Sequence, residues 1–198
     1  MSHYFENDKN LKSEIKELSY KYGSFPFLFY SDNGVFSKHA IDYGSKLLLE
    51  TYLSLDNEPK KVLDVGCGYG YIGIVIGVIN NSEVDMIDVN KRAVHLTEKN
   101  IKRYRDFKGS AFLSDAYENV GSKYDVIITN PPIRVGKNKV LEILEGAFDH
   151  LNDNGYLYYV IRKDQGALSI KKILESINTV ELINRDKGYY VFRIKKNN

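Results

Sequence analysis

The chain has 198 residues, 43% of them hydrophobic, so it can bury a substantial core, and its length fits one domain better than two. It has no run of eighteen apolar residues and no signal peptide at its N-terminus, so we expect a soluble, cytoplasmic protein that does not contact membranes. A single cysteine and four scattered histidines exclude an internal disulfide and predict no metal site, and a net charge of +2 alone does not indicate a polyanionic partner.

The first part of the chain alternates in short apolar bursts. Glu17–Tyr22 and Phe25–Tyr30 predict two short strands around a turn at Gly23-Ser24, and Asp32-Asn33-Gly34 predicts a second turn. We therefore divide the chain into a small β appendage, residues 1–35, and a main domain, residues 36–198. Within the main domain, apolar residues at helical spacing over Ile41–Leu55 predict one helix that leads into the core.

From Lys60 onwards, short apolar runs alternate with helix-length segments, which is typical of parallel βαβ units. The predicted strands are Lys61–Val65, Glu83–Ile87, Gly109–Leu113, Tyr124–Thr129 and Gly155–Ile161. The predicted helices between them are Tyr71–Ile79, Lys91–Tyr104 and Lys137–His150, whereas Ala116–Gly121 is long enough only for a turn or two.

The end of the main domain differs from its beginning. A predicted helix over Ala167–Ser176 is followed by strands over Thr179–Asn184 and Tyr189–Ile194, which are joined by the tight turn Asp186-Lys187-Gly188. Strands joined by so few residues must run antiparallel, because a parallel return needs a crossover of a dozen or more residues. The sequence thus predicts a parallel sheet that ends in an antiparallel hairpin.

A glycine-rich loop, Gly66-Cys67-Gly68-Tyr69-Gly70, follows the first core strand and precedes an apolar helix. Its glycines permit a sharp turn, and we expect them to bring bare N–H groups against a ligand at the N-terminus of the helix. Gly68 to Gly73 also matches G-x-G-x-x-G, and Asp88 follows Gly68 by 20 residues, a pattern that taken alone favours NAD.

Asp64 argues against a dinucleotide, because a carboxylate inside the loop would repel a pyrophosphate but suits the cationic end of S-adenosylmethionine. Asp88, followed by Val89, is predicted to accept hydrogen bonds from ribose hydroxyls with either cofactor. Asp115 could accept a hydrogen bond from an adenine amino group while Ala116 offers its N–H to the ring, although Asp115 also suits a helix N-cap. Cys67 is interpreted as a small loop residue with no nucleophilic role.

The motif Asn130-Pro131-Pro132-Ile133 follows the fourth core strand, at the carboxyl edge where α/β proteins bind ligands. Two prolines make this turn rigid, so the Asn130 side-chain oxygen and a nearby carbonyl can act as fixed acceptors. Two acceptors that hold both N–H bonds of an amide-like amine would aim its lone pair at a methyl donor and stabilise the developing positive charge. Such catalysis needs no strong base before attack; a plain strand-ending turn is the other interpretation.

Taken together, these motifs resemble the class I S-adenosylmethionine-dependent methyltransferases of the "small domain" family, which includes ribosomal RNA guanine-N2 methyltransferases. The resemblance rests on the glycine loop, the three aspartates, Asn130-Pro131-Pro132-Ile133, and the leading segments Gly34-Val35-Phe36-Ser37 and Asp42-Tyr43-Gly44-Ser45. It implies an α/β Rossmann-like sheet of seven strands, in the order 3-2-1-4-5-7-6, with the last strand antiparallel. It also implies the cofactor S-adenosylmethionine.

The resemblance further implies site residues before the core. In the family, the leading segment closes over the cofactor and the target, so Ser37, Asp42 and Gly44 become candidates for cofactor binding and Phe36 for substrate binding; a turn and a helix N-cap would equally explain them. Many amino-methyltransferases have Phe or Tyr where this chain has Ile133, so stacking on a target base must come from elsewhere, with Phe36 and Tyr71 as candidates.

Cations follow two of the core strands on the same rim. Arg134, Lys137 and Lys139 follow the fourth strand, and Arg162 and Lys163 follow the fifth, where they could bind phosphates beside a looped-out base. The partner we expect is RNA, either free ribosomal RNA or an assembling ribosomal particle. Two alternatives are a protein glutamine methyltransferase, which shares the Asn-Pro-Pro chemistry, and a non-catalytic RNA-binding module with the same fold.

Overall fold

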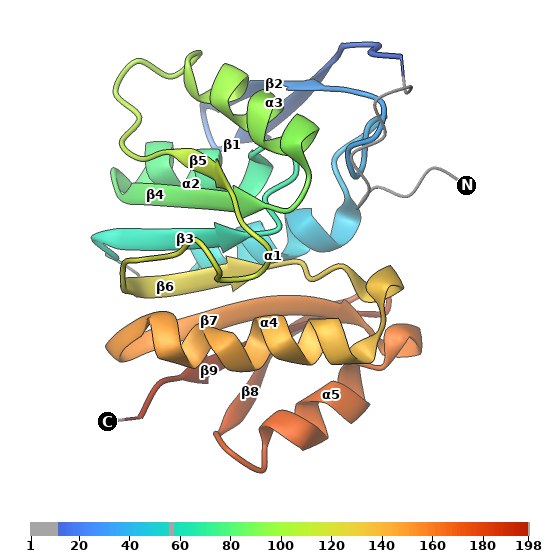
Figure 1. The fold of residues 1–198 in the computed structure, drawn as a ribbon, viewed down its shortest axis with the longest axis vertical. Coiled ribbons are helices and arrows are strands. Elements are labelled where there is room, and N and C mark those ends of the chain that lie inside the picture. The colour runs from blue at the N-terminus through green and yellow to red at the C-terminus, as the bar shows by residue number, and fades with distance from the viewer. Residues whose placement is uncertain (1–11, 56–57, 198) are drawn as a thin grey trace.

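The computed structural model describes residues 12–55 and 58–197, which form two β-sheets and a set of covering helices (Figure 1). A seven-stranded sheet has the order β5-β4-β3-β6-β7-β9-β8. Its strands are β3 (Lys61–Val65), β4 (Glu83–Asp88), β5 (Ala111–Leu113), β6 (Tyr124–Thr129), β7 (Leu151–Arg162), β8 (Val180–Asp186) and β9 (Tyr189–Lys195). A separate hairpin pairs β1 (Lys16–Tyr22) with β2 (Phe25–Ser31).

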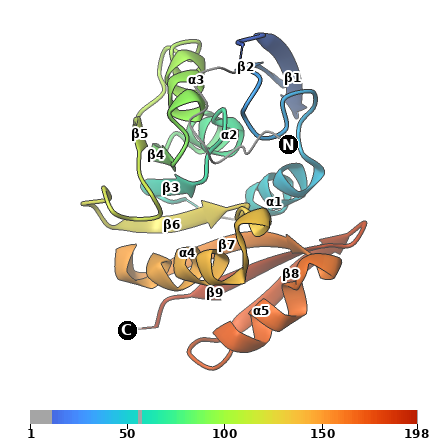
Figure 2. The same ribbon diagram turned by 45° about the vertical axis from the view of Figure 1, so that its right-hand side comes forward.

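The helices cover both faces of the large sheet (Figure 2). One face packs against α1 (Tyr43–Leu53), α2 (Tyr71–Asn80) and α3 (Lys91–Ile101), and the other against α4 (Lys137–His150) and α5 (Ala167–Leu174). Neighbouring strand residues alternate between the two cores: Val126 and Ile128 lie in the first and Ile127 in the second, as a two-residue side-chain period requires. Two short 3₁₀ turns, η1 (Ile133–Val135) and η2 (Lys163–Gln165), precede α4 and α5.

The predicted topology is confirmed. Numbered among themselves, the seven strands have the order 3-2-1-4-5-7-6, and β9 is antiparallel to both of its neighbours. The turn between β8 and β9 consists of Lys187 and Gly188 with φ angles of 45° and 80°, the left-handed geometry of a tight hairpin. Strand β7 begins four residues before its predicted start, because the register shift beside Tyr124 accommodates the turn-like residues 152–154 inside the strand.

The N-terminal hairpin shares a hydrophobic core with the main domain. Phe27 and Phe29 are buried, and the Phe29 ring lies 5.7 Å from the ring of Tyr71 in an edge-on contact. On the backbone side, the Asn100 amide of α3 accepts from the Tyr30 N–H at 2.7 Å and donates to the Tyr30 carbonyl at 2.9 Å. The division after residue 35 stays a prediction, and residues 1–11 of the appendage lie outside the described part of the chain.

Within residues 12–55 and 58–197, no helix has both the length and the apolar character needed to cross a membrane.

Candidate active site

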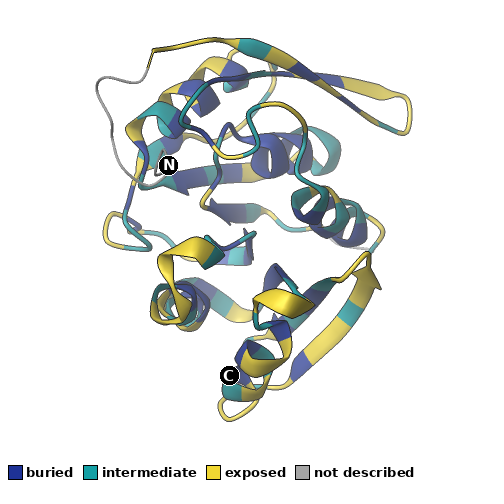
Figure 3. Cartoon of the chain, turned by 90° about the vertical axis from the view of Figure 1, so that its right-hand side faces the viewer, coloured by how far each residue is buried: buried dark blue, intermediate teal, exposed yellow. Residues whose placement is uncertain are grey.

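The carboxyl ends of β4, β3 and β6 meet at one edge of the sheet, the side that Figure 3 views. Val65 pairs with Ile87 on one side and with Thr129 on the other, so the loops that follow these strands begin side by side. A hollow opens there, as expected at the edge where α/β proteins bind ligands. The residues that line it are Phe36, Ser37, Asp42, Ser45, Asp64, Gly66, Cys67, Gly68, Tyr69, Tyr71, Ile72 and Asn130.

The lining contains most of the residues predicted to bind the cofactor, together with Phe36. The predicted residues outside the lining are Gly44, Gly70, Asp88, Val89, Asp115 and Ala116. The structure thus brings the leading segment, the glycine loop and the Asn-Pro-Pro turn together from distant parts of the sequence.

The glycine loop turns sharply, because Gly66, Gly68 and Gly70 have left-handed φ angles of 75°, 59° and 88°. The expectation that it presents bare N–H groups is wrong for four residues. Gly66 and Cys67 donate to the Ile87 carbonyl at 2.8 and 2.9 Å, Gly68 donates to Asp88 at 2.9 Å, and Gly70 donates to the Cys67 carbonyl at 2.9 Å. With these donors already bonded, the loop is poorly suited to hold a pyrophosphate, which disfavours a dinucleotide.

Asp64 lines the hollow, but its side chain is almost completely buried. Its Oδ2 accepts the Gly73 N–H at 2.9 Å, and Gly73 must lack a side chain, because a Cβ there would lie 2.6 Å from Met86 and 3.2 Å from the same oxygen. Burial, with a smaller contribution from the charge of Asp88, raises the pKa of Asp64 to about 7. A cation in the hollow would stabilise the ionised form of this carboxylate.

Asp88 lies directly behind the glycine loop at the end of β4. Its Oδ2 accepts the Gly68 N–H at 2.9 Å and its Oδ1 accepts the Asn90 N–H at 2.8 Å, while burial raises its pKa above the usual value. Each carboxylate oxygen has a second lone pair, so Asp88 keeps the capacity to accept from a ligand's hydroxyls. Val89 follows it and is half-buried.

Asn130 is held from its amide nitrogen. Nδ2 donates to Asp42 Oδ2 at 3.0 Å and to Ser45 Oγ at 2.9 Å, so both of its hydrogens are bonded within the protein. Asp42 is itself the N-cap of α1 and accepts the Ser45 N–H at 2.8 Å. The Asn130 side-chain oxygen therefore remains as an acceptor with a fixed position at the hollow, and Pro131 behind it is buried.

Two of the predicted glycines are closely packed, and their role in cofactor binding stays a prediction. A Cβ on Gly44 would lie 2.7 Å from the Tyr189 ring, so this position lets β9 pack against the start of α1. A Cβ on Gly70 would lie 2.8 Å from Thr97 of α3. Both glycines shape the site through their neighbours and do not line it.

The leading segment lies at the rim. Phe36 lines the hollow with 51% of its surface exposed, so its ring is available to a ligand. Ser37 has a left-handed φ of 60°, and its hydroxyl donates to the Ala40 carbonyl, which shapes the turn. The other candidate for stacking, Tyr71, is buried, and its ring packs edge-on against Tyr20 at 5.1 Å. Phe36 is therefore the better placed of the two.

The predicted adenine contacts lie at the margin of the site. Asp115 forms an ion pair with Lys139 at 2.6 Å, and Ala116 follows it with a left-handed φ of 45°. Asp115 also accepts the Glu118 N–H through its backbone carbonyl in the turn after β5. One carboxylate oxygen of Asp115 is thus engaged by α4.

The predicted rim cations do not behave alike. Lys139 is paired with Asp115 and with Glu142. Arg162 pairs with Asp164 at 3.0 Å and lies 5.4 Å from the centre of the Tyr189 ring. Lys137 donates to the Ser169 hydroxyl at 2.9 Å, whereas Arg134 within η1 and Lys163 at the start of η2 are exposed.

Three lining residues were absent from the predicted site: Ser45, Tyr69 and Ile72. Ser45 lies three residues after the predicted N-cap Asp42, a spacing that puts it on the same helical turn, but its contact with Asn130 spans 85 residues. From the sequence, Tyr69 and Ile72 are ordinary apolar residues.

Cys67 is buried, and burial raises the pKa of its thiol, in keeping with the absence of a nucleophilic role.

In the described ranges, no group of three or more His, Cys, Asp and Glu side chains is arranged to hold a metal ion.

Comparisons with known proteins identify the family to which the chain belongs. The family model of the methyltransferase small domain matches residues 26–193. The Bacillus subtilis (strain 168) protein "Uncharacterized protein YbxB" is 39% identical over 198 residues, which cover 98% of each chain. Ribosomal RNA small subunit methyltransferase C of Haemophilus influenzae (strain 86-028NP) is 38% identical over 137 residues, covering 66% of this chain and 40% of that protein.

Among solved structures, the Thermus thermophilus 16S rRNA N2 G1207 methyltransferase RsmC, in complex with AdoMet and guanosine, superposes with a TM-score of 0.82 at 25% identity. The match covers 92% of this chain and 51% of that one, so the chain spans about half the length of this relative. These matches confirm the fold and family predicted from the sequence, and they support the predicted cofactor, S-adenosylmethionine. The chain belongs to the methyltransferase small domain family.

Proposed function

We propose that this chain is an S-adenosylmethionine-dependent N-methyltransferase whose target is the exocyclic N2 amine of guanine in ribosomal RNA. The observation that carries the proposal is the fixed acceptor at the hollow: Asn130, anchored through both hydrogens of its amide by Asp42 and Ser45. The chain would act in the cytoplasm, on free ribosomal RNA or on an assembling particle.

The walls of the hollow suit a cationic nucleoside cofactor. Asp64 and Asp42 line it, so they would favour the ammonium and sulfonium charges, and Asp88 behind Gly68 would accept from the ribose hydroxyls. When bound there, S-adenosylmethionine supplies a methyl group on a positively charged sulfur. Gly66 and Gly68 keep side chains out of the space beside Asp88.

Asn130 would position the amine. The lone pair of an exocyclic amino group is delocalised into the ring, so the amine is a weak nucleophile. The Asn130 oxygen and a carbonyl of the rigid Pro131-Pro132 turn would accept its two N–H bonds, aim the lone pair at the methyl carbon and stabilise the positive charge that develops on nitrogen. The bound cofactor would supply the methyl group, and the methylated amine would lose one proton to solvent. Phe36 at the rim would contact the face of the base.

The choice of RNA rests on two further observations. Ribosomal RNA small subunit methyltransferase C is among the relatives of this chain, and one solved relative is described with guanosine. On this chain, Arg134 and Lys163 are exposed next to the Asn-Pro-Pro-Ile turn and at the end of β7, where they can contact phosphates.

The test is methyl transfer to RNA. The purified chain is incubated with tritium-labelled S-adenosylmethionine and ribosomal RNA from cells that lack the protein, and nucleosides are then resolved by mass spectrometry. We expect label in N2-methylguanosine, with free RNA and ribosomal particles compared as substrates. Label in a release-factor glutamine would favour the protein glutamine methyltransferase, and RNA binding without any transfer would favour the non-catalytic module. Either result overturns the proposal.

A further inference from the structure

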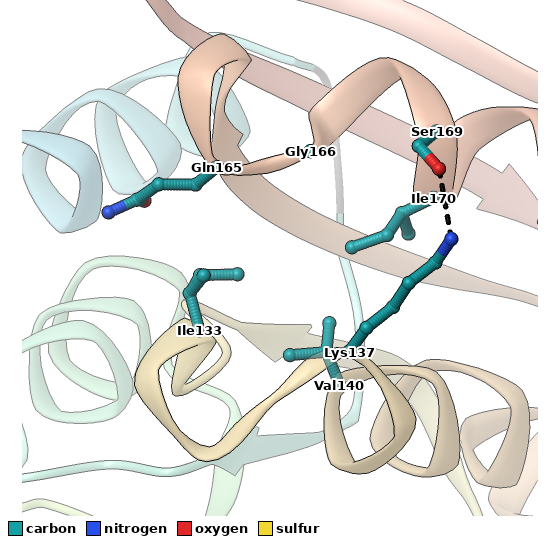
Figure 4. A pocket seen from close by; sticks show the side chains of 7 residues that line it. All are labelled: Ile133, Lys137, Val140, Gln165, Gly166, Ser169 and Ile170. Atoms are coloured by element: carbon teal, nitrogen blue, oxygen red, sulfur yellow. Dashed lines mark hydrogen bonds between the residues drawn. The ribbon is translucent and has the colours of Figure 1, made fainter.

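A second pocket, of about 100 Å³, opens at the other end of the Asn-Pro-Pro-Ile turn. Asn130 begins this turn and lines the first hollow, whereas Ile133 ends it and lines the second pocket. The walls come from η1, α4, η2 and α5 (Figure 4). The lining residues are Ile133, Lys137, Val140, Gln165, Gly166, Ser169 and Ile170. Because Ile133 follows Asn130 by three positions, these two residues lie no more than about 10 Å apart.

The second pocket has an apolar interior and a polar rim. Ile133 and Ile170 project into the same space from η1 and α5, with Val140 below them (Figure 4). At the rim, Lys137 reaches across to the Ser169 hydroxyl at 2.9 Å (Figure 4). Gln165 also lines the pocket and is exposed; its amide, which points away from Ile170 in Figure 4, can both donate and accept. Apolar walls with a polar rim suit one heteroaromatic ring.

Charge distinguishes the two pockets. The first is lined by two carboxylates, Asp42 and Asp64, and the second by the ammonium of Lys137 with no carboxylate in its lining. Exposed cations continue from the second pocket on both sides: Arg134 follows Ile133, and Lys163 opens the 3₁₀ turn that contains Gln165. The first pocket therefore suits a cationic ligand, and the second suits a ring attached to phosphates.

The size of the pocket limits its occupant further. The pocket, of about 100 Å³, is smaller than the about 300 to 1,000 Å³ of sites that enclose a whole small molecule, so it would enclose only part of its ligand, such as one ring. Outside the pocket, phosphates would meet Lys137 and its neighbouring cations.

We propose that this pocket binds the base of an unpaired nucleotide that flanks the methylated one. This inference rests on the proposed function, because it deepens RNA recognition at the same site. Target and neighbour would be splayed out on opposite ends of the Asn-Pro-Pro-Ile turn, the target at Asn130 and its neighbour at Ile133. Gln165 would read the edge of the neighbouring base, and Lys137 would contact the adjoining phosphate.

The test is binding of a fluorescein-labelled single-stranded RNA of about 12 nucleotides, compared with the same strand in a duplex, in the presence of S-adenosylhomocysteine. Fluorescence anisotropy of the intact chain should show a preference of about tenfold for the single strand, since only an unpaired base can enter the pocket. Ser169→Phe fills the pocket from its exposed rim and should abolish this preference. Leu168→Phe adds a ring at the neighbouring exposed position, outside the lining, and should leave it intact.

Lys137→Ala tests the phosphate contact separately. Its loss should lower the slope of log affinity against log salt concentration by about 0.7 while the single-strand preference persists. Lys172→Ala removes the same charge from an exposed position on α5 that does not line the pocket, so its slope should match that of the parent.

Two outcomes overturn the inference: a Ser169→Phe chain that prefers single strands as the parent does, or a parent chain with no such preference. Methyl transfer to ribosomal RNA, measured on the same preparations, separates this inference from the proposed function. A parent that methylates RNA although Ser169→Phe changes nothing refutes only the flanking-base pocket. A parent that binds unpaired RNA through the pocket but transfers no methyl group refutes only the proposed activity.

Discussion

The two ends of the Asn130 amide have different roles: the nitrogen anchors the side chain, and the oxygen is the proposed acceptor. Its nitrogen is bonded to Asp42 and Ser45, and these bonds decide which way its oxygen points. A side chain anchored at one end loses little rotamer freedom when a substrate arrives, so the acceptor is preorganised. This arrangement makes Asn130 the residue on which the proposed chemistry depends most.

Asn130→Ala should lower kcat for methyl transfer by about 100-fold, because it removes one of two preorganised groups that meet the developing charge. The affinity for S-adenosylhomocysteine, measured by isothermal titration calorimetry, should stay within about twofold of the parent. Ser45→Ala is the graded control: it removes one of the two anchors, and we expect a smaller loss of kcat. A fully active Asn130→Ala enzyme would contradict the mechanism.

The raised pKa of Asp64 leads to a second prediction about a single residue. Burial raises its pKa to about 7, so between the usual carboxyl pKa and about 7 the folded protein keeps a proton that the unfolded chain has released. Between these two pH values, the contribution of Asp64 to the free energy of unfolding therefore falls as the pH rises. Without a ligand, folded Asp64 favours its protonated form below about pH 7. A cationic ligand stabilises the carboxylate instead, so its binding must displace the proton.

The affinity for S-adenosylhomocysteine should therefore rise with pH, by up to about tenfold per unit, and level off above about pH 7. Calorimetry in two buffers of different ionisation enthalpy should show a proton released on binding at pH 6. Asp64→Asn should flatten the dependence, and NAD, as the control ligand, should give no binding heat. A pH profile unchanged by Asp64→Asn would show that this carboxylate does not face the ligand's charge.

At the scale of elements, the hairpin of β1 and β2 is fastened to the main domain through α3. Asn100 is fully buried and bonds both backbone groups of Tyr30, and it also donates to the Tyr69 carbonyl in the glycine loop at 2.8 Å. Tyr104 adds contacts at 3.0 Å to both backbone groups of Leu28. The hairpin and the glycine loop are thus tied to the same helix, α3.

Asn100→Ala should reduce the free energy of unfolding by about 2 to 3 kcal/mol, since it leaves buried backbone groups without partners. For a chain of this length the melting temperature should fall by roughly 4 to 10 °C, and affinity for S-adenosylhomocysteine should fall with it. Glu98→Ala, at an exposed position on α3, should change stability by less than about 0.5 kcal/mol. Equal melting curves for the two variants would show that the hairpin is held by its apolar face alone.

At the scale of the molecule, local patterns in the sequence predicted the alternating strands and helices and the antiparallel end, whereas the strand order was implied by the family resemblance. The alternation of strand and helix lengths determines the βαβ units, and the short turn at Lys187-Gly188 permits only an antiparallel return. The sequence could not reveal hydrogen bonds between residues that lie far apart along the chain. The donors of Gly66 and Cys67 are used by a carbonyl of β4, and Asn130 is oriented by a serine 85 residues earlier.

The rim cations illustrate the same limit. From the sequence, Lys137 and Lys139 were equivalent, but the fold places one at Ser169 and pairs the other with Asp115 of a different loop. The positions of these lysines could be predicted from the ends of the strands that they follow. Which of them forms an ion pair, and with which partner, depends on tertiary contacts that the sequence does not show.

The direction of β9 has a practical consequence. This strand starts beside Arg162 at the carboxyl edge and ends at Lys195 beside Tyr156, towards the opposite edge, where Lys196 is tied to Gly155 and Leu151. An affinity tag or a biosensor linker fused after this strand would emerge at the rear of the molecule. Immobilised in this way, the protein would present the hollow at the carboxyl edge of its sheet to the solution.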